Sequence, residues 1–217
     1  MQTRFKKSMI LLAIMITGIG VFIIGGQAGG WQPMDNVVKL KAVGLYGDGW
    51  QGTAFFIADN LLVTAGHCVA DANEIILVLA DGKEMQAIDW YSEPEVDIGI
   101  IEILTPEKER RLGFDNAELG EEVLAVGNPY GVYPALNRGI VSALDVPDAY
   151  WFQKNMLVVD CPLHPGNSGC PVFDKQNNVL GVCSWGYSPV MTCCVPSDIV
   201  ELVIQKYKAA KALREAE

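Results

Sequence analysis

The chain has 217 residues, half of them apolar, and a formal net charge of −10. This length is enough for one or two small domains with a substantial core. A nucleic-acid-binding protein needs a basic surface to meet phosphates, so the acidic balance argues against that class of function.

Residues 1–30 have the pattern of an export segment and are not expected to belong to the folded domain. Three basic residues precede an apolar run over residues 9–24, and small residues follow it at 25–28. This order is typical of a secretory signal whose basic flank stays inside the cell. The length of the run fits both a cleaved signal peptide and an N-terminal membrane anchor. Either way, the rest of the chain is expected to be exported, as a periplasmic, extracellular or membrane-anchored domain.

From residue 35 onward, short apolar stretches alternate with turn residues. The expected strands cover residues 37–43, 53–57, 61–65, 74–79, 84–90, 98–103, 122–126, 139–144, 156–161, 171–173, 179–185 and 192–195. Many short strands with regular turns predict an all-β barrel or sandwich. The absence of alternating long helices argues against a doubly wound α/β sheet. Residues 106–112 are polar and are expected to form a linker.

One helix is predicted at the C-terminus, over residues 197–217. Ser197 or Asp198 is expected to be its N-cap. Apolar or long side chains then recur at helical spacing, at Ile199, Leu202, Val203, Lys206, Tyr207 and Ala210. This stripe is expected to pack onto the second set of strands.

The sequence contains six cysteines: Cys68, Cys161, Cys170, Cys183, Cys193 and Cys194. Export would permit disulfides, but their pairing does not follow from sequence. Buried free thiols are an equally open interpretation. No Cys-x-x-Cys pair or neighbouring histidine provides zinc-ligand spacing, so neither a metal nor another cofactor is expected.

Three short motifs have the chemistry of a nucleophilic site. Ser168 lies in the turn Gly166–Gly169, where backbone N–H groups can converge on a developing oxyanion. A serine hydroxyl needs an adjacent base, and His67 follows the apolar strand 61–65. Asp97 precedes the apolar strand 98–103, where a carboxylate needs a partner; the far nitrogen of His67 would satisfy it. Each motif alone is more often structural, but together they predict a catalytic triad.

These motifs resemble those of trypsin-like serine peptidases, and the HtrA/Deg branch in particular. The resemblance rests on Thr64–Cys68, Asp97–Ile100 and Gly166–Gly169, together with Gly127–Gly131, Gly139–Ala143 and Val179–Val182. It covers roughly residues 35–207. It implies two six-stranded antiparallel β-barrels, over 35–115 and 116–196, with the active site in the cleft between them. The first barrel would supply His67 and Asp97, and the second barrel would supply Ser168.

The resemblance also assigns roles in peptide-bond hydrolysis. Ser168 would attack the scissile carbonyl of a protein or peptide, His67 would transfer the proton, and Asp97 would orient His67. The backbone N–H groups of Gly166 and Ser168, with Asn167 between them, would form the oxyanion hole. The specificity pocket would be lined by Cys161, Pro162, Leu163, Ser184, Trp185 and Gly186. These pocket residues include no acid, so a small or aliphatic residue is expected at the cleaved position.

Several residues depart from the family pattern. Cys170 replaces a usual glycine, and His164 replaces an asparagine that is usual in the HtrA branch. The usual cysteine partner of Cys68, near Gln51, is missing. The chain ends after the predicted helix, so no PDZ domain is expected.

Three alternatives to an active serine endopeptidase remain open at this point. The same fold can serve as a catalytically silent binding module. Cys170 can be considered as the nucleophile of a cysteine peptidase, although it lies outside the oxyanion turn. An exported metal-binding protein would use Cys183, Cys193 and Cys194.

Overall fold

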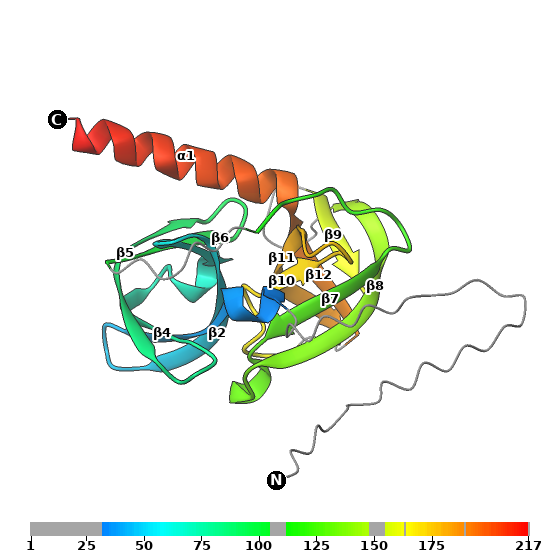
Figure 1. The fold of residues 1–217 in the computed structure, drawn as a ribbon, viewed down its shortest axis with the longest axis horizontal. Coiled ribbons are helices and arrows are strands. Elements are labelled where there is room, and N and C mark those ends of the chain that lie inside the picture. The colour runs from blue at the N-terminus through cyan, green and yellow to red at the C-terminus, as the bar shows by residue number, and fades with distance from the viewer. Residues whose placement is uncertain (1–31, 105–111, 148–154, 163, 189, 217) are drawn as a thin grey trace, which may run out of the picture. The chain divides into compact units, whose positions relative to one another are not determined.

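The computed structural model describes residues 32–104, 112–147, 155–162, 164–188 and 190–216 (Figure 1). The predicted export segment and residues 106–111 of the predicted linker lie outside this range. Within the described part of the chain, no helix combines the length and apolar character needed to cross a membrane.

The first half of the described chain forms a closed antiparallel barrel. Its strands are β1 (Val37–Gly44), β2 (Gly49–Ala58), β3 (Leu61–Ala65), β4 (Ala72–Val78), β5 (Glu84–Glu93) and β6 (Ile98–Ile103). They pair in the order β1-β2-β3-β6-β5-β4, and pairing of β1 with β4 closes the barrel. The alternating sequence of β1 matches its alternating burial, as a strand with one face on a core requires.

The second half forms another closed antiparallel barrel. Its strands are β7 (Glu122–Gly127), β8 (Ala135–Pro147), β9 (Asn155–Val159), β10 (Pro171–Phe173), β11 (Val179–Ser188) and β12 (Met191–Pro196). Their order is β7-β8-β9-β12-β11-β10, so the two barrels share one topology. The prediction of an all-β fold with two six-stranded barrels is therefore confirmed. β2 and β8 begin earlier than predicted because residues 49–52 also pair with β1 and residues 135–138 also pair with β7.

The short 3₁₀ helix η1 (Gln32–Asn36) precedes β1, and two others connect strands: η2 (Gly66–Cys68) and η3 (Pro129–Gly131). Each barrel encloses its own apolar core, which includes Phe56 and Leu62 in the first and Leu180 and Val172 in the second. A third apolar cluster contains residues from both barrels and from the C-terminal helix. This shared cluster packs the two barrels and the helix together.

The C-terminal helix, α1 (Ser197–Glu215), is confirmed as an element, but its predicted N-cap is wrong. Pro196 is the N-cap, because the Ser197 hydroxyl instead donates a hydrogen bond to the Asp115 carbonyl at 2.6 Å. The predicted stripe is also partly wrong, since Leu202 is exposed. The buried positions are Val200, Val203, Ile204 and Tyr207.

Helix α1 also contacts more of the protein than predicted. It packs on β11 and β12, as expected, and on β6 of the first barrel as well. Figure 1 shows α1 running from the end of the second barrel across β6 toward β5.

A direct set of hydrogen bonds joins the first barrel to the turn that contains Ser168. The backbone N–H of Thr53 donates to the Ser168 carbonyl at 2.8 Å, and the Thr53 hydroxyl donates to the Gly166 carbonyl at 2.8 Å. The Thr64 hydroxyl donates to the Thr53 carbonyl at 2.7 Å. Gly169 fits against this surface only because it has no Cβ: a Cβ there would lie 2.2 Å from both the Thr53 carbonyl and the Thr64 hydroxyl.

This close approach gives a stability prediction. Gly82 has a positive φ of 85° with open space around it, so Gly82→Ala should cost only the strain of a left-handed alanine, about 1 kcal/mol. Gly169 has nearly the same φ, 84°, but is tightly packed. Gly169→Ala should therefore cost about 1–3 kcal/mol more. Chemical denaturation of the full chain measures both variants, and equal losses would contradict the packing argument.

Candidate active site

His67 is positioned by the short helix that follows β3. The Gly66 N–H donates to the Asp97 carbonyl at 2.9 Å, and the His67 N–H donates to Asp97 Oδ1 at 2.7 Å. The Ser92 hydroxyl donates to the Gly66 carbonyl at 3.1 Å. Backbone and side-chain hydrogen bonds thus hold the start of η2 on both sides, while the His67 side chain stays half exposed, at 50%.

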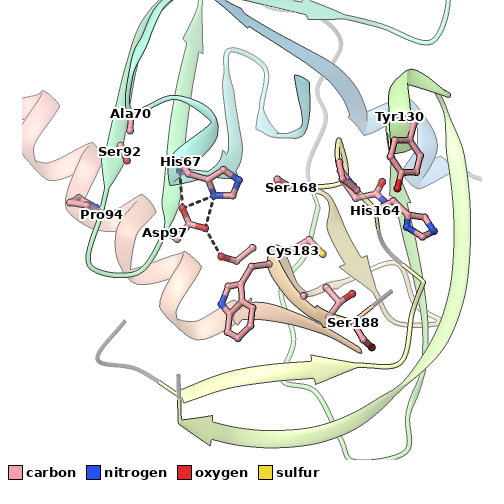
Figure 2. A pocket seen from close by; sticks show the side chains of 16 residues that line it. His67, Ala70, Ser92, Pro94, Asp97, Tyr130, His164, Ser168, Cys183 and Ser188 are labelled. Atoms are coloured by element: carbon pink, nitrogen blue, oxygen red, sulfur yellow. Dashed lines mark hydrogen bonds and ion pairs between the residues drawn. The ribbon is translucent and has the colours of Figure 1, made fainter. Parts of the chain in front are cut away.

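Asp97 lies in the turn between β5 and β6 and is 5% exposed. Its carboxylate is 2.9 Å (Oδ2) and 3.1 Å (Oδ1) from His67 Nδ1. Oδ2 also accepts a hydrogen bond from the hydroxyl of Ser184 on β11 (Figure 2). Because a carboxylate only accepts hydrogen bonds, Nδ1 carries the proton, which leaves Nε2 as the basic nitrogen of a neutral His67.

The surroundings of His67 raise its pKa. Burial of part of the ring favours the neutral form, but the hydrogen bond that the ring donates to Asp97, the neighbouring Cys68 and the Asp97 charge outweigh it and raise the pKa to about 10. The imidazolium form is therefore strongly stabilised at this position.

Ser168 lies in the turn between β9 and β10, and this turn is held from inside the second barrel as well. The Asn167 N–H donates to the His164 carbonyl at 2.9 Å, and the Cys170 N–H donates to the Asn167 carbonyl at 2.8 Å. Gly166 has a φ of 99°, which favours glycine. Among the described residues, the N–H groups of Gly166 and Ser168 have no acceptor. The Asn167 N–H, by contrast, is already used.

His67, Asp97 and Ser168 all line one cavity of about 870 Å³ (Figure 2). Asp97 and His67 are in direct contact. Among the interactions of the described residues, no hydrogen bond joins Ser168 to His67. The three predicted catalytic residues therefore line one cavity, and Ser168 is not bonded to His67 among the described interactions.

The cavity contains only some of the predicted pocket residues. Ser184, Trp185 and Gly186 line it. Cys161 and Pro162 are not among the lining residues. Cys161 is fully buried, and its carbonyl accepts a hydrogen bond from the Thr192 hydroxyl at 3.2 Å. Leu163 lies outside the described residues.

Several lining residues were missed by the sequence analysis: Ala70, Ser92, Pro94, Tyr130, Cys183, Ser188 and Thr192. Thr192 lies directly opposite Gly186 in the register of β11 and β12, which a pairing of these strands would have indicated. The Tyr130 ring stacks on His164 at 5.4 Å between centroids, and both line the cavity. A contact between side chains from separate turns had no signal in the sequence.

All six cysteines are buried, and none of them forms a disulfide in the part of the chain that the structure describes. Cys183 and Cys194 pair across β11 and β12, with their sulfurs 4.0 Å apart. Burial and the neighbouring thiols raise the pKa of Cys183 well above its usual value, which favours the unreactive thiol. Cys170 is fully buried and does not line the cavity. In the described part of the chain, no group of three or more candidate ligands is arranged to hold a metal ion.

The fold and this constellation agree with the match to a family model. Residues 52–182 match the model described as a trypsin-like peptidase domain, and the chain belongs to this family.

Curated relatives include HtrA/Deg-type proteases. A "probable periplasmic serine endoprotease DegP-like" from Brucella suis biovar 1 is 31% identical over 72% of this chain. A protein with the same description from Pseudomonas fulva is 35% identical over 61% of it. The chain spans about a third of the length of these relatives, 32% and 28% respectively.

Solved structures agree with these relatives. The "HtrA-type protease AlgW with tripeptide" is 26% identical with a TM-score of 0.73; the match covers 79% of this chain and 60% of that one. The serine endoprotease from Yersinia pestis is 21% identical with a TM-score of 0.71, over 80% of this chain and 63% of that one. The second likeness supports the fold alone.

The contact between Asp97 and His67 predicts a raised pKa of the His67 ring. In the wild type, the pKa of His67 should lie well above 6.5, because imidazolium gains the carboxylate as a partner. Asp97→Asn should lower this pKa, since the amide carries no charge. NMR titration of the ring protons measures it, and His164→Gln assigns the signals of the two histidines. An unchanged His67 pKa in Asp97→Asn would contradict the pairing.

Proposed function

We propose that the protein is a serine endopeptidase that hydrolyses peptide bonds through an acyl-enzyme intermediate. One observation carries this proposal: a buried carboxylate holds Nδ1 of His67, and Ser168 lines the same cavity in a turn with two unused N–H groups. Membership of the trypsin-like peptidase family supports it, as do relatives named serine endoproteases.

In the proposed mechanism, Ser168 Oγ attacks the scissile carbonyl carbon while His67 Nε2 removes the hydroxyl proton. The carbonyl oxygen becomes negative and accepts hydrogen bonds from the Gly166 and Ser168 N–H groups. His67 then gives the proton to the leaving amine, which releases the C-terminal product. Water repeats the sequence on the ester, with His67 again acting as base, and restores the Ser168 hydroxyl.

Asp97 would orient the His67 ring and stabilise its positive charge. Two hydrogen bonds from His67, through its backbone N–H and its ring, hold the imidazole in one tautomer. The raised pKa of His67 stabilises the imidazolium that forms during attack. The same effect leaves less neutral base in the resting protein, so the rate should increase with pH.

The substrate would be an unfolded segment of a protein, or a peptide, bound in extended form. Trp185 and Gly186 lie at the cavity end of β11, where a substrate backbone can add to the strand. Among the described residues that line the cavity, Asp97 is the only one with a carboxylate, and it is already paired. An uncharged small or aliphatic side chain at the cleaved position is therefore favoured over lysine or arginine.

Export of the domain is the proposed location, in agreement with the basic and apolar pattern of residues 1–30. The Brucella and Pseudomonas relatives are named periplasmic. Residues 1–30 would either be removed or hold the domain at the membrane.

The second candidate function is a catalytically silent binding module of the same fold. One observation favours it: no hydrogen bond joins Ser168 to His67 among the described residues, so the nucleophile is not yet bonded to its base.

Labelling with a fluorophosphonate probe separates the two functions. The wild-type full chain should be labelled, because an activated serine attacks the phosphorus atom, and Ser168→Ala should lose all labelling. Peptidase activity should fall by about 10⁶ in the same variant. The variant Ser142→Ala, at an exposed serine on β8, controls for nonspecific labelling. A folded wild type that is never labelled would favour the binding module.

The labelling rate should also depend on pH. It should rise as His67 loses its proton and fall at lower pH, where imidazolium cannot accept the proton of Ser168. The midpoint should match the pKa of His67 found by NMR, and a midpoint near 6.5 would contradict the proposed pairing with Asp97.

Substrate preference follows from the lack of an unpaired carboxylate among the described residues that line the cavity. In a panel of fluorogenic peptides that differ only at the cleaved position, alanine, valine or leucine should exceed arginine by about tenfold or more in kcat/KM. The measurement is the initial rate at low substrate concentration. Preferential cleavage after arginine would show that an acidic group outside the described lining forms the pocket.

A further inference from the structure

Helix α1 covers two buried carboxylates of the first barrel. Glu93, at the end of β5, is 8% exposed, and Glu102, on β6, is 7% exposed. Lys206 of α1 forms an ion pair with Glu93, and Lys211 forms an ion pair with Glu102. The helix thus places one ammonium group against each of these glutamates.

Each glutamate also has a neutral donor. The Tyr91 hydroxyl donates to Glu93 Oε2 at 2.7 Å, and the Tyr207 hydroxyl donates to Glu102 Oε2 at 3.2 Å. The two tyrosine rings lie 6.0 Å apart, between β5 and α1. Exposed ion pairs contribute little to stability, but a carboxylate that has lost most of its water depends on its partners. Glu93 and Glu102 are of this second kind.

The surroundings of Glu93 connect it to the proposed catalytic groups. The Val96 N–H donates to the Glu93 carbonyl at 3.3 Å, and Glu93 pairs with Ile98 in the β5–β6 register. Glu93 therefore closes the turn that holds Asp97. Its neighbour Ser92 donates to the Gly66 carbonyl, next to His67.

Glu102 has no such connection. It lies four residues beyond Ile98, about 13 Å along an extended strand. Besides Lys211, its side chain accepts hydrogen bonds from Asn60 and Tyr207, which do not line the cavity. The two ion pairs of α1 are therefore similar in chemistry and different in their distance from Asp97.

We propose that Glu93 and Lys206 are positioning residues: by docking on Glu93, helix α1 holds the turn of Asp97, and through Ser92 the start of η2, in the geometry that the catalytic groups need. This role rests on the proposed peptidase function. The Lys211–Glu102 pair secures the same helix without reaching the site.

Two matched variants test this role in the full chain. Lys206→Met and Lys211→Met each remove one ammonium group and keep a similar side-chain volume, and Lys206→Arg restores the charge. For each variant, NMR titration gives the pKa of His67, the fluorophosphonate reaction gives the labelling rate of Ser168, and denaturation gives the stability. The groups that face His67 are Asp97 and Cys68, and those that face Glu93 are Lys206 and Tyr91.

Lys206→Met should loosen the contact between Asp97 and His67. The pKa of His67 should then fall toward its ordinary value, and the labelling rate at saturating pH should fall about tenfold. Lys211→Met should lower the stability without changing either quantity, and Lys206→Arg should behave as the wild type. If Lys206→Met does not fold, the double variant Glu93→Gln/Lys206→Met removes the unpaired charge and provides the same comparison.

Equal effects of Lys206→Met and Lys211→Met on His67 would overturn the positioning role, and so would an unchanged His67 in Lys206→Met. The NMR titration does not depend on catalysis. If the wild type is not labelled but Lys206→Met alone lowers the pKa of His67, the peptidase proposal fails and the positioning role stands.

Discussion

The buried carboxylate of Asp97 is the group on which the site depends. At 5% exposure it has lost most of its water, so it requires donors that the protein must supply. The first barrel supplies two, the backbone N–H and the ring of His67, and the second barrel supplies the Ser184 hydroxyl. One carboxylate therefore orients the His67 ring and links the two barrels at the cavity.

The first barrel in turn holds a segment of the second barrel, the turn that contains Ser168. Thr53 donates to the carbonyls of both Gly166 and Ser168, and Gly169 fits where a side chain cannot. Each barrel thus holds a part of the other's contribution to the site. Movement between the barrels would disturb both sets of hydrogen bonds at once, which favours a rigid junction.

Much of this arrangement was predictable from local sequence patterns. The short apolar stretches between turn residues identified the strands, and the three motifs around His67, Asp97 and Ser168 identified the candidate site. Contacts between distant segments were not predictable. The Ser184 hydroxyl bonds to Asp97 from 87 residues away, and Lys206 reaches Glu93 from 113 residues away. The Ser197 hydroxyl, which was expected to cap the helix, instead donates a hydrogen bond to a distant group, the Asp115 carbonyl.

The division of the site between barrels has a consequence for the order of synthesis. A ribosome completes the first barrel before it reaches Ser168, so the nascent chain at that point holds His67 and Asp97 but not the proposed nucleophile. Ser184 and α1 are made later still. Under the proposed function and location, an incomplete chain passing through an export channel would be unable to cut the channel or itself, and the last residues to emerge would bring the site together.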